Sequence, residues 1–398
     1  METVPVEEIA HRIAFFQNAL SEQGLQSALL LHNVGVYYFS GTLQTSFLHV
    51  PAQGDPLLLV IKYAERAQQE SPLDHIIPIR GRSGFSEALE TAGQPLRGRI
   101  GLELDVLPAA FLLWLQKTFP ACEWVDVSGV IRSQRMIKSA YEVAQIRRAL
   151  AIEHEAFLDL TRTIREGMTE LEVDGRLALL ARRAGHQGIV RMRGWNQEMT
   201  YAHVLSGENG DAASYLNSAH GGAGTCPAMP QGASHRPIGR NEPVMVDFSV
   251  GINGYVGDQS RTYVIGELSG PLQAAHDCSR RIHEQFMETA GPGVTCRAVY
   301  ERAAEEARTS GLSSTFMGHG PNQVRFVGHG IGLEVDELPI LAPAFDLPLA
   351  PGMVLALEPK FVLPGQGVVG LEDDYLVTEG GVECISLTEQ DVLHVQGA

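Results

Sequence analysis

Five residues with oxygen or nitrogen donors lie in apolar or glycine-rich surroundings in the second half of the sequence. They are Asp247 and Asp258 in VDFSVGINGYVGD, His329 in FVGHGIG, Glu358 in MVLALEPKF and Glu372 in VVGLEDDYLV. A carboxylate inside a run of valine and leucine costs several kcal/mol unless it is paired with a cation or coordinates one. Together, such residues can ligate a pair of divalent ions ~3.5–4 Å apart, with carboxylates bridging the ions.

The chemistry expected of such a centre is hydrolysis, because two ions generate a hydroxide near neutral pH and stabilise a developing oxyanion. Asp247 and Asp258 lie on successive predicted strands joined by a Gly-Ile-Asn-Gly turn, so a hairpin can place both on one face of a sheet. Like charges on that face repel and therefore need a cation. A single acid in an apolar strand could simply face solvent, but four acids with a histidine favour the metal site.

The elements that must position these residues fall into two predicted domains. Residues 1–132 alternate helices (7–24 and 109–119) with short apolar strands (27–32, 55–62 and 97–105), which is typical of an α/β domain. Tyr37, Tyr38 and Phe39 are expected to lead into a turn at Ser40 and Gly41.

Residues 133–398 are predicted to form an α+β domain. Two helices begin at capping boxes, Ser139 with Glu142 and Thr169 with Glu172, and a glycine-rich loop follows over residues 205–240. Strands (243–266 and 327–377) and further helices (272–289 and 296–310) complete the domain. We expect the helices to cover one side of a mostly antiparallel sheet.

Composition excludes several classes of function. The chain has 398 residues and a formal charge of −17, which disfavours nucleic acid and anionic lipid surfaces as partners. Its N-terminus has neither the basic nor the apolar region of a signal peptide, and no apolar run approaches the ~20 residues of a membrane span. We therefore expect a cytoplasmic protein. The five cysteines are scattered without C-x-x-C spacing, so a disulfide framework or a thiolate zinc site is not expected.

The order V-D-x(10)-D, G-H-G-I-G, L-E-P and L-E-D-D strongly resembles the superfamily of prolidase, aminopeptidase P, methionine aminopeptidase and creatinase. The resemblance covers most of the chain, since YYFSG and RMIKSAYEVAQIRRA are similar to motifs of the N-terminal domain and the linker helix. It implies a pita-bread catalytic domain after a smaller creatinase/prolidase-type α/β domain. It also implies two divalent ions per chain (Mn, Co, Zn or Fe) and a homodimer.

The same resemblance implies roles for the five residues. Asp247 would be bidentate to one ion, and Asp258 and Glu372 would bridge both ions. His329 and Glu358 would complete the coordination of the other ion. Glu358 would also contact the bridging water and accept its proton. Glu358 and His329 are therefore the predicted catalytic residues. The glycines beside His329 are expected to leave room for the substrate and the metal-bound turn.

The residues that handle the substrate in this superfamily differ here. Asp336 stands where a histidine is usual, and Gly370 stands where an arginine is usual. A further histidine expected before Asp247 is missing from its usual place, so His220 or His235, in an apparent insertion, could replace it or could simply lie on the surface. Ionised Asp336 can only accept hydrogen bonds, so either its pKa is raised or the substrate brings a donor such as an amine or cation.

Another stretch could line the substrate pocket. The sequence RMRGWNQEM contains Arg191, Arg193 and Trp195, and its arginines could hold a substrate carboxylate. The same stretch could equally be an edge strand with solvated charges. We therefore predict Asp336, Arg191, Arg193, Trp195 and His220 as substrate-binding residues and keep this alternative open.

The function predicted first is hydrolysis of a peptide-like amide by a metal-bridging hydroxide, on an Xaa-Pro dipeptide or an N-terminal Xaa-Pro bond. The small peptide is then the partner. A second hypothesis keeps the metal but makes the protein a non-peptide C–N hydrolase or a C–S lyase acting on a small zwitterionic or cationic substrate. A third is a binding module on the same fold that holds no metal.

Overall fold

The computed structural model describes residues 2–396 and divides the chain into two compact units, the first of which ends at Arg135. Helix α6 (Ser128–Met136) spans this division. Among the described residues, no helix is both long and apolar enough to cross a membrane. Each unit has its own hydrophobic core, and each is described separately below.

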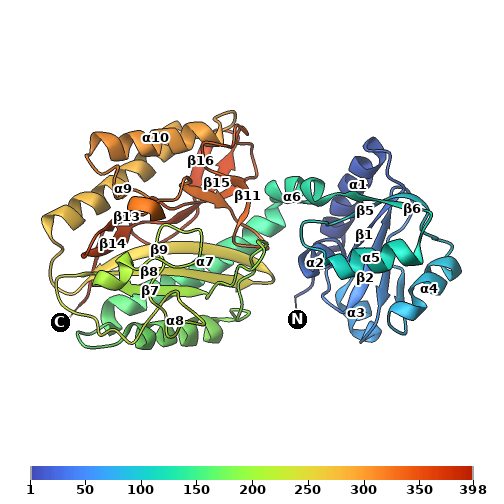
Figure 1. Cartoon of the computed structure of the whole chain (residues 1–398), viewed down its shortest axis with the longest axis horizontal. Helices are drawn as coiled ribbons and strands as arrows, with labels where there is room; N and C mark the ends of the chain where they lie inside the picture. The colour runs from blue at the N-terminus through green and yellow to red at the C-terminus, as the bar shows by residue number, and fades with distance from the viewer. Residues whose placement is uncertain (1, 397–398) are drawn as a thin grey trace. The chain divides into compact units, whose positions relative to one another are not determined.

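The N-terminal unit is built on a six-stranded mixed sheet with the order β4-β3-β2-β1-β5-β6 (Figure 1). Its remaining elements, in chain order, are α1 (Val6–Glu22), β1 (Ser27–Leu30), α2 (Asn33–Ser40), β2 (Ser46–Pro51), β3 (Leu57–Val60), α3 (Ala64–Glu70), β4 (Ile76–Pro78), η1 (Arg82–Gly84), α4 (Phe85–Thr91), β5 (Gly98–Leu102), α5 (Ala109–Thr118) and β6 (Cys122–Asp126).

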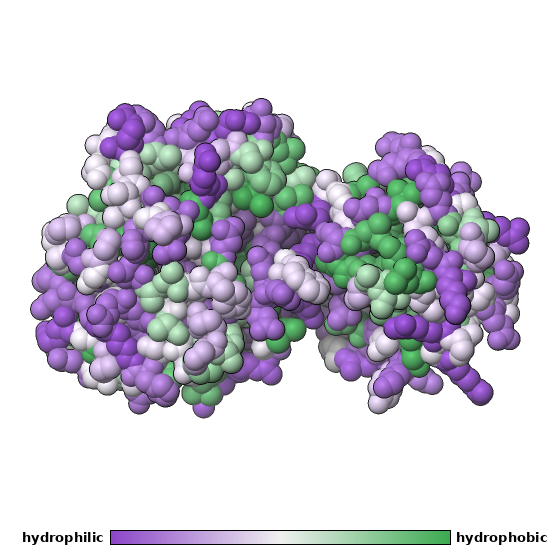
Figure 2. All heavy atoms as spheres, viewed as in Figure 1, coloured by the Kyte–Doolittle hydropathy of each residue, from purple (hydrophilic) through white to green (hydrophobic). Residues whose placement is uncertain are grey.

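The predicted elements of this unit are present, with one difference. The aromatic residues expected to lead into a turn form the last turn of helix α2, which ends at Gly41 with a φ of 73°. Glycine adopts this left-handed conformation without the steric cost of a side chain. The apolar runs of β1, β3 and β5 are buried in the sheet, and Phe47 and Phe85 pack together in the core. Apolar side chains also gather on the visible face around α5 (Figure 2).

The C-terminal unit begins with two long helices whose capping boxes form as predicted. In each box the hydroxyl of the first residue accepts a hydrogen bond from the backbone N–H of the glutamate, and the glutamate carboxylate accepts one from the first residue's N–H. These reciprocal bonds satisfy donors that a helix start otherwise leaves unpaired. The helices are α7 (Ala140–Thr163) and α8 (Glu170–Ala184).

Two curved layers of strands follow. The other elements are β7 (Ala202–Ser206), η2 (Gly207–Asp211), β8 (Pro243–Ile252), β9 (Tyr255–Val264), α9 (Gly270–Thr289), α10 (Cys296–Thr309), η3 (Gly320–Asn322), β10 (Gly328–Gly330), β11 (Glu337–Ile340), β12 (Val354–Leu357), β13 (Lys360–Leu363), β14 (Gly367–Gly370), β15 (Asp373–Thr378), β16 (Gly381–Cys384) and β17 (Leu393–His394). The sheets have the orders β17-β9-β8-β7, β11-β10-β12-β15-β16 and β13-β14.

Helices cover the strands on two sides, not on one side as expected from the sequence (Figure 1). Helices α7 and α8 pack against the β7–β9 sheet, whereas α9 contacts β13, β14 and β16 and packs against α10. Each sheet therefore buries its apolar face under its own helices, and two cores result. Between the layers, polar residues of the strands contact one another beside a small apolar cluster of Leu205, Met245, Val362 and Val368.

Candidate metal centre

The β8–β9 hairpin brings the two aspartates to one face. Asp247 lies opposite Ser260, and Ser249 lies opposite Asp258, so the carboxylates are diagonal neighbours in the antiparallel pair. The Ser249 hydroxyl donates a 2.7 Å hydrogen bond to Oδ1 of Asp258. Both aspartates are buried, which makes a compensating cation necessary.

The two glutamates enter the same space from the facing layer. Glu358 follows directly after β12, and Glu372 lies between β14 and β15, where its backbone pairs with Ser260 of β9. The Ser260 hydroxyl donates a 2.7 Å hydrogen bond to Oε2 of Glu372. Both glutamates are buried, so the structure brings together the four predicted carboxylates from β8, β9 and the loops that flank β13 and β14.

His329 lies in β10, with its Nε2 3.5 Å from Oε1 of Glu358 and 4.0 Å from Oε1 of Glu372. Its Nδ1 is 3.2 Å from the carbonyl oxygen of Gly330. A proton on Nδ1 can be donated to this carbonyl, which leaves the Nε2 lone pair directed to the carboxylates as a metal ligand.

The glycines beside His329 serve a different purpose from the predicted one. A Cβ on Gly328 would lie 2.2 Å from the carbonyl oxygen of Ala356, and a Cβ on Gly330 would lie 2.1 Å from that of Leu338. Their space is therefore filled by the backbones of the neighbouring strands and leaves no room for substrate. The glycines permit close strand packing, which fixes the position of the histidine.

The sequence analysis missed Lys360, whose ammonium lies among the predicted metal ligands. Its Nζ is 2.7 Å from Oε2 of Glu372, 3.0 Å from Oε2 of Glu358 and 3.2 Å from Oδ2 of Asp247. The lysine side chain is 1% exposed. A sequence signal existed, because alternate residues in extended backbone point to the same side and Lys360 is two residues after Glu358.

The charges of the cluster are strongly coupled. Burial would raise the pKa of the Asp247 carboxyl, but the Lys360 ammonium and His220 bring that pKa well below its usual range. Burial raises the pKa of Glu372 to about 7, against the opposing effect of Lys360. For Asp258, burial and then the neighbouring Glu372 and Asp247 raise the pKa well above its usual value. Burial lowers the pKa of Lys360, but Asp247, Glu358 and Glu372 outweigh it and the net pKa is raised.

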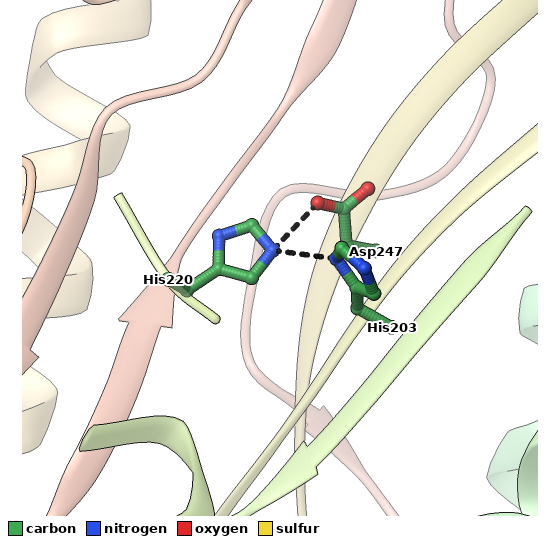
Figure 3. A group of neighbouring side chains, drawn as sticks. All are labelled: His203, His220 and Asp247. Carbon is green, nitrogen blue, oxygen red and sulfur yellow. Dashed lines mark hydrogen bonds and ion pairs between the residues drawn. The ribbon is translucent and has the colours of Figure 1, made fainter. Parts of the chain in front are cut away.

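His220 reaches the cluster, whereas His235 is exposed. Nε2 of His220 lies 2.8 Å from Oδ2 of Asp247 and 3.4 Å from Nδ1 of His203 (Figure 3). His203 is in β7 directly opposite Asp247 of β8, a pairing that the sequence analysis did not anticipate. Burial and the nearby His220 lower the pKa of His203 to about 4, so His203 is neutral at pH 7.

A cavity of about 220 Å³ opens beside His220. It is lined by residues 210–214, 216–221, 318–319 and 321–324 and by Val362 of β13. At its wall, Nε2 of His319 is 2.5 Å from Oδ1 of Asp211. The cavity thus joins the glycine-rich loop after β7 to the cluster through the imidazole of His220.

The other predicted substrate residues lie along a second segment. Oδ1 of Asp336 accepts a 3.1 Å hydrogen bond from the backbone N–H of Arg193, and the carbonyl of Arg191 accepts one from Val335. The guanidinium of Arg193 is 3.7 Å from Glu334, whereas Trp195 is 89% exposed. Burial raises the pKa of Asp336, against the hydrogen bond from Arg193. The substrate role of these residues stays a prediction.

The donors present fit a divalent ion. Ligand atoms of Asp258, His329 and Glu372 all lie within 4.8 Å of one another, and the same is true of His203, His220 and Asp247. Carboxylates with one imidazole suit Mn, Co, Zn or Fe. In the described structure Lys360 contacts one residue of each group, Glu372 of the first through Oε2 and Asp247 of the second through Oδ2.

Comparison with known proteins agrees with this geometry. Residues 144–379 match the model of metallopeptidase family M24, and residues 12–137 match the creatinase/prolidase N-terminal domain. An Xaa-Pro dipeptidase of Pyrococcus furiosus is 26% identical over 377 residues, which cover 94% of this chain and 97% of that protein. A probable dipeptidase PepE of Mycobacterium tuberculosis is 25% identical over 402 residues, which cover 98% of this chain and 97% of that protein.

Solved structures show the same two-unit fold. The Xaa-Pro dipeptidase from Bacillus anthracis superposes with a TM-score of 0.81 at 24% identity, covering 97% of this chain and 99% of that one. The prolidase from Pyrococcus horikoshii OT3 has a TM-score of 0.81 at 24% identity, covering 96% and 99%. The predicted fold, an α+β pita-bread unit after a smaller α/β unit, is confirmed.

Proposed function

Because this chain belongs to metallopeptidase family M24 and is a metal-dependent hydrolase, we propose that it cleaves a small peptide-like amide. Xaa-Pro dipeptides and peptides with an N-terminal Xaa-Pro bond are the first substrate class. The names of the relatives from Pyrococcus furiosus and Pyrococcus horikoshii support this class.

The observation that carries the proposal is the position of His220. This imidazole lines the cavity and also lies 2.8 Å from Oδ2 of Asp247, so a substrate in the cavity lies next to the carboxylate cluster. A cavity of about 220 Å³ suits a substrate of dipeptide size rather than a folded protein.

In amide hydrolysis, some residues of the cluster would bind the metal ion and another would transfer the proton. A bound divalent ion supplies Lewis acidity, which polarises the scissile carbonyl and acidifies water. We propose Asp258, His329 and Glu372 as its ligands, with Glu358 beside them. The carboxylate of Glu358 accepts the proton of the attacking water and delivers it to the leaving nitrogen, as a general base and then a general acid. Burial of these groups excludes bulk water and strengthens each interaction.

A second ion would have to share the carboxylates of Asp247, Glu358 and Glu372, whose oxygens Lys360 already contacts. The hydrolase proposal requires a bound ion and does not require a second one. Carboxylate and imidazole donors of this kind bind Mn, Co, Zn or Fe.

One observation favours a second candidate function. The residue at position 370, where the superfamily pattern has an arginine, is a glycine, and Asp336 lies near His329 beside the buried Glu334. A site that has Asp336 and lacks that arginine suits a small cationic or zwitterionic substrate better than a peptide carboxylate. We therefore keep a non-peptide C–N hydrolase or C–S lyase as the alternative.

A single substrate panel tests both functions. Protein loaded with Mn²⁺ or Co²⁺ is assayed against Xaa-Pro dipeptides, longer peptides with N-terminal Xaa-Pro, small zwitterionic amides and sulfonium compounds. We expect turnover of the Xaa-Pro class that is lost with a chelator. Turnover of the zwitterions or sulfonium compounds alone would replace the peptidase proposal with the alternative, and no metal-dependent turnover of any class would overturn both.

A further inference from the structure

The Lys360 ammonium is held by three carboxylates that would otherwise bind a metal ion. Its three contacts, of 2.7 to 3.2 Å, go to Glu372, Glu358 and Asp247. An ammonium has three N–H donors, so one donor is available for each carboxylate. We propose that this ammonium permanently takes the place of one of the two ions, and that the centre holds a single divalent ion at Asp258, His329 and Glu372. This inference rests on the metal requirement of the proposed function.

The position of Lys360 is determined by its strand and by burial. It begins β13, its carbonyl accepts a 2.8 Å hydrogen bond from the Met317 N–H, and it pairs with Gly370 of β14. The side chain is 1% exposed, so solvent offers the ammonium no alternative partner in this conformation. Moving it out would leave a buried cluster of carboxylates without its cation, which is strongly unfavourable.

In both glutamates one carboxylate oxygen contacts Lys360 and the other faces His329. Oε2 of Glu372 and Oε2 of Glu358 accept from Lys360, whereas the Oε1 atom of each faces Nε2 of His329 at 4.0 and 3.5 Å. The glutamates therefore connect two cation positions. The ammonium occupies one of them, and the other has an imidazole nitrogen and the Asp258 carboxylate as further donors.

Charge balance favours one ion over two. Asp247, Glu358 and Glu372 contact the ammonium, and Asp258 and Glu372 belong to the candidate ion site, so these four carboxylates supply the negative charge nearest to the two cation positions. Two divalent ions together with the ammonium would exceed their combined negative charge in a buried site, where repulsion between cations is weakly screened. An ammonium and one divalent ion leave a site that these carboxylates can neutralise.

The test counts Mn²⁺ ions on the intact protein. Metal-free protein is saturated with Mn²⁺, excess ion is removed by gel filtration, and bound manganese is measured by mass spectrometry and by electron paramagnetic resonance. We expect one ion per chain and the six-line spectrum of an isolated ion. Lys360→Met removes the ammonium and retains most of the side-chain volume, so this variant should bind two ions whose spectrum shows coupling. The matched control, Lys117→Met in the exposed part of α5, should bind one ion.

The spectrum of the unaltered protein decides the question even if Lys360→Met does not fold. Two coupled ions per chain would overturn the inference while leaving the hydrolase proposal intact. A folded Lys360→Met variant that still binds one ion would also overturn it, because the ammonium would then not be what excludes the second ion. No bound Mn²⁺ on the unaltered protein, together with no metal-dependent turnover, would overturn the hydrolase proposal itself.

Discussion

Lys360 and Gly370 lie directly opposite each other in the antiparallel β13–β14 pair. A Cβ at position 370 would lie 2.6 Å from the Pro359 carbonyl oxygen and 2.8 Å from Cα of Lys360, and the φ of Gly370 is +154°. The backbone that carries the lysine into the cluster thus occupies the space of a side chain at position 370. The backbone of residues 359 and 360 therefore excludes any side chain, an arginine included, at position 370 in this conformation.

Gly370→Ala should therefore destabilise the C-terminal unit. The methyl group meets backbone atoms that cannot move without shifting β13, so we expect a loss of about 2–3 kcal/mol in the free energy of unfolding. Urea denaturation of the metal-free protein measures it. Gly365→Ala is the matched control, because Gly365 also has a positive φ, +71°, but its Cβ would meet nothing within 4 Å. Equal losses in the two variants would show that backbone conformation, and not the contact with Lys360, determines the cost.

Glu358→Gln should lower kcat by about 10²–10⁴-fold on whichever substrate the panel identifies, because an amide cannot accept the proton of the attacking water. Bound Mn²⁺ is measured in parallel, so that a loss of ion is not mistaken for a loss of base. Glu383→Gln, which changes an exposed glutamate paired with Arg147, serves as the control and should keep its rate. A full rate in Glu358→Gln would rule out the proposed proton transfer.

His220→Asn should reduce kcat/KM by about tenfold or more, since it removes the imidazole that joins the cavity to Asp247. His235→Asn changes the exposed histidine of the same glycine-rich region and should leave kcat/KM unchanged. Steady-state kinetics on both variants compares them directly. Comparable losses in the two variants would mean that the loop as a whole, rather than the His220 contact, supports activity.

Stability should fall as the pH drops from about 6.5 towards 4, in part through His276 of α9. Burial lowers the pKa of His276 to about 4, with Asp277 and Asp391 opposing and Arg261 and Arg280 reinforcing the shift. In the unfolded chain the pKa of His276 is the ordinary 6.5, so below pH 6.5 the unfolded state binds more protons than the folded state. The free energy of unfolding is therefore highest above that pH and falls by at most about 2 kcal/mol between pH 7 and pH 5.

Urea midpoints at pH 7 and pH 5 check this expectation. His276→Gln should show a smaller loss between the two pH values than the unaltered protein, whatever its absolute stability. His235→Gln, at the exposed position, should retain the full loss. An unchanged difference in His276→Gln would assign the acid sensitivity to other groups.

Much of the fold and of the buried carboxylate cluster could be predicted from local sequence. The capping boxes at Ser139 and Thr169 form because their partners are three residues away, which is a local relationship. Asp247 and Asp258 share a face because one short turn sets the register of β8 against β9. The cost of burying four carboxylates, together with the glycine-framed His329, indicates a cation site from the sequence alone.

The remaining features depend on elements that are distant in sequence. His203 meets Asp247 because β7 pairs with β8 across the glycine-rich loop, and His220 reaches both because that loop folds back over them. Helices α7 and α8 pack on one sheet and α9 on the strands of the other layer, because each layer buries its own apolar face. By itself the sequence determined that cations must neutralise this cluster, because buried charge must be paired. Only the tertiary structure decided that one of those cations is Lys360, because Asp247 of β8 comes within reach of its ammonium only when the two layers of strands face each other.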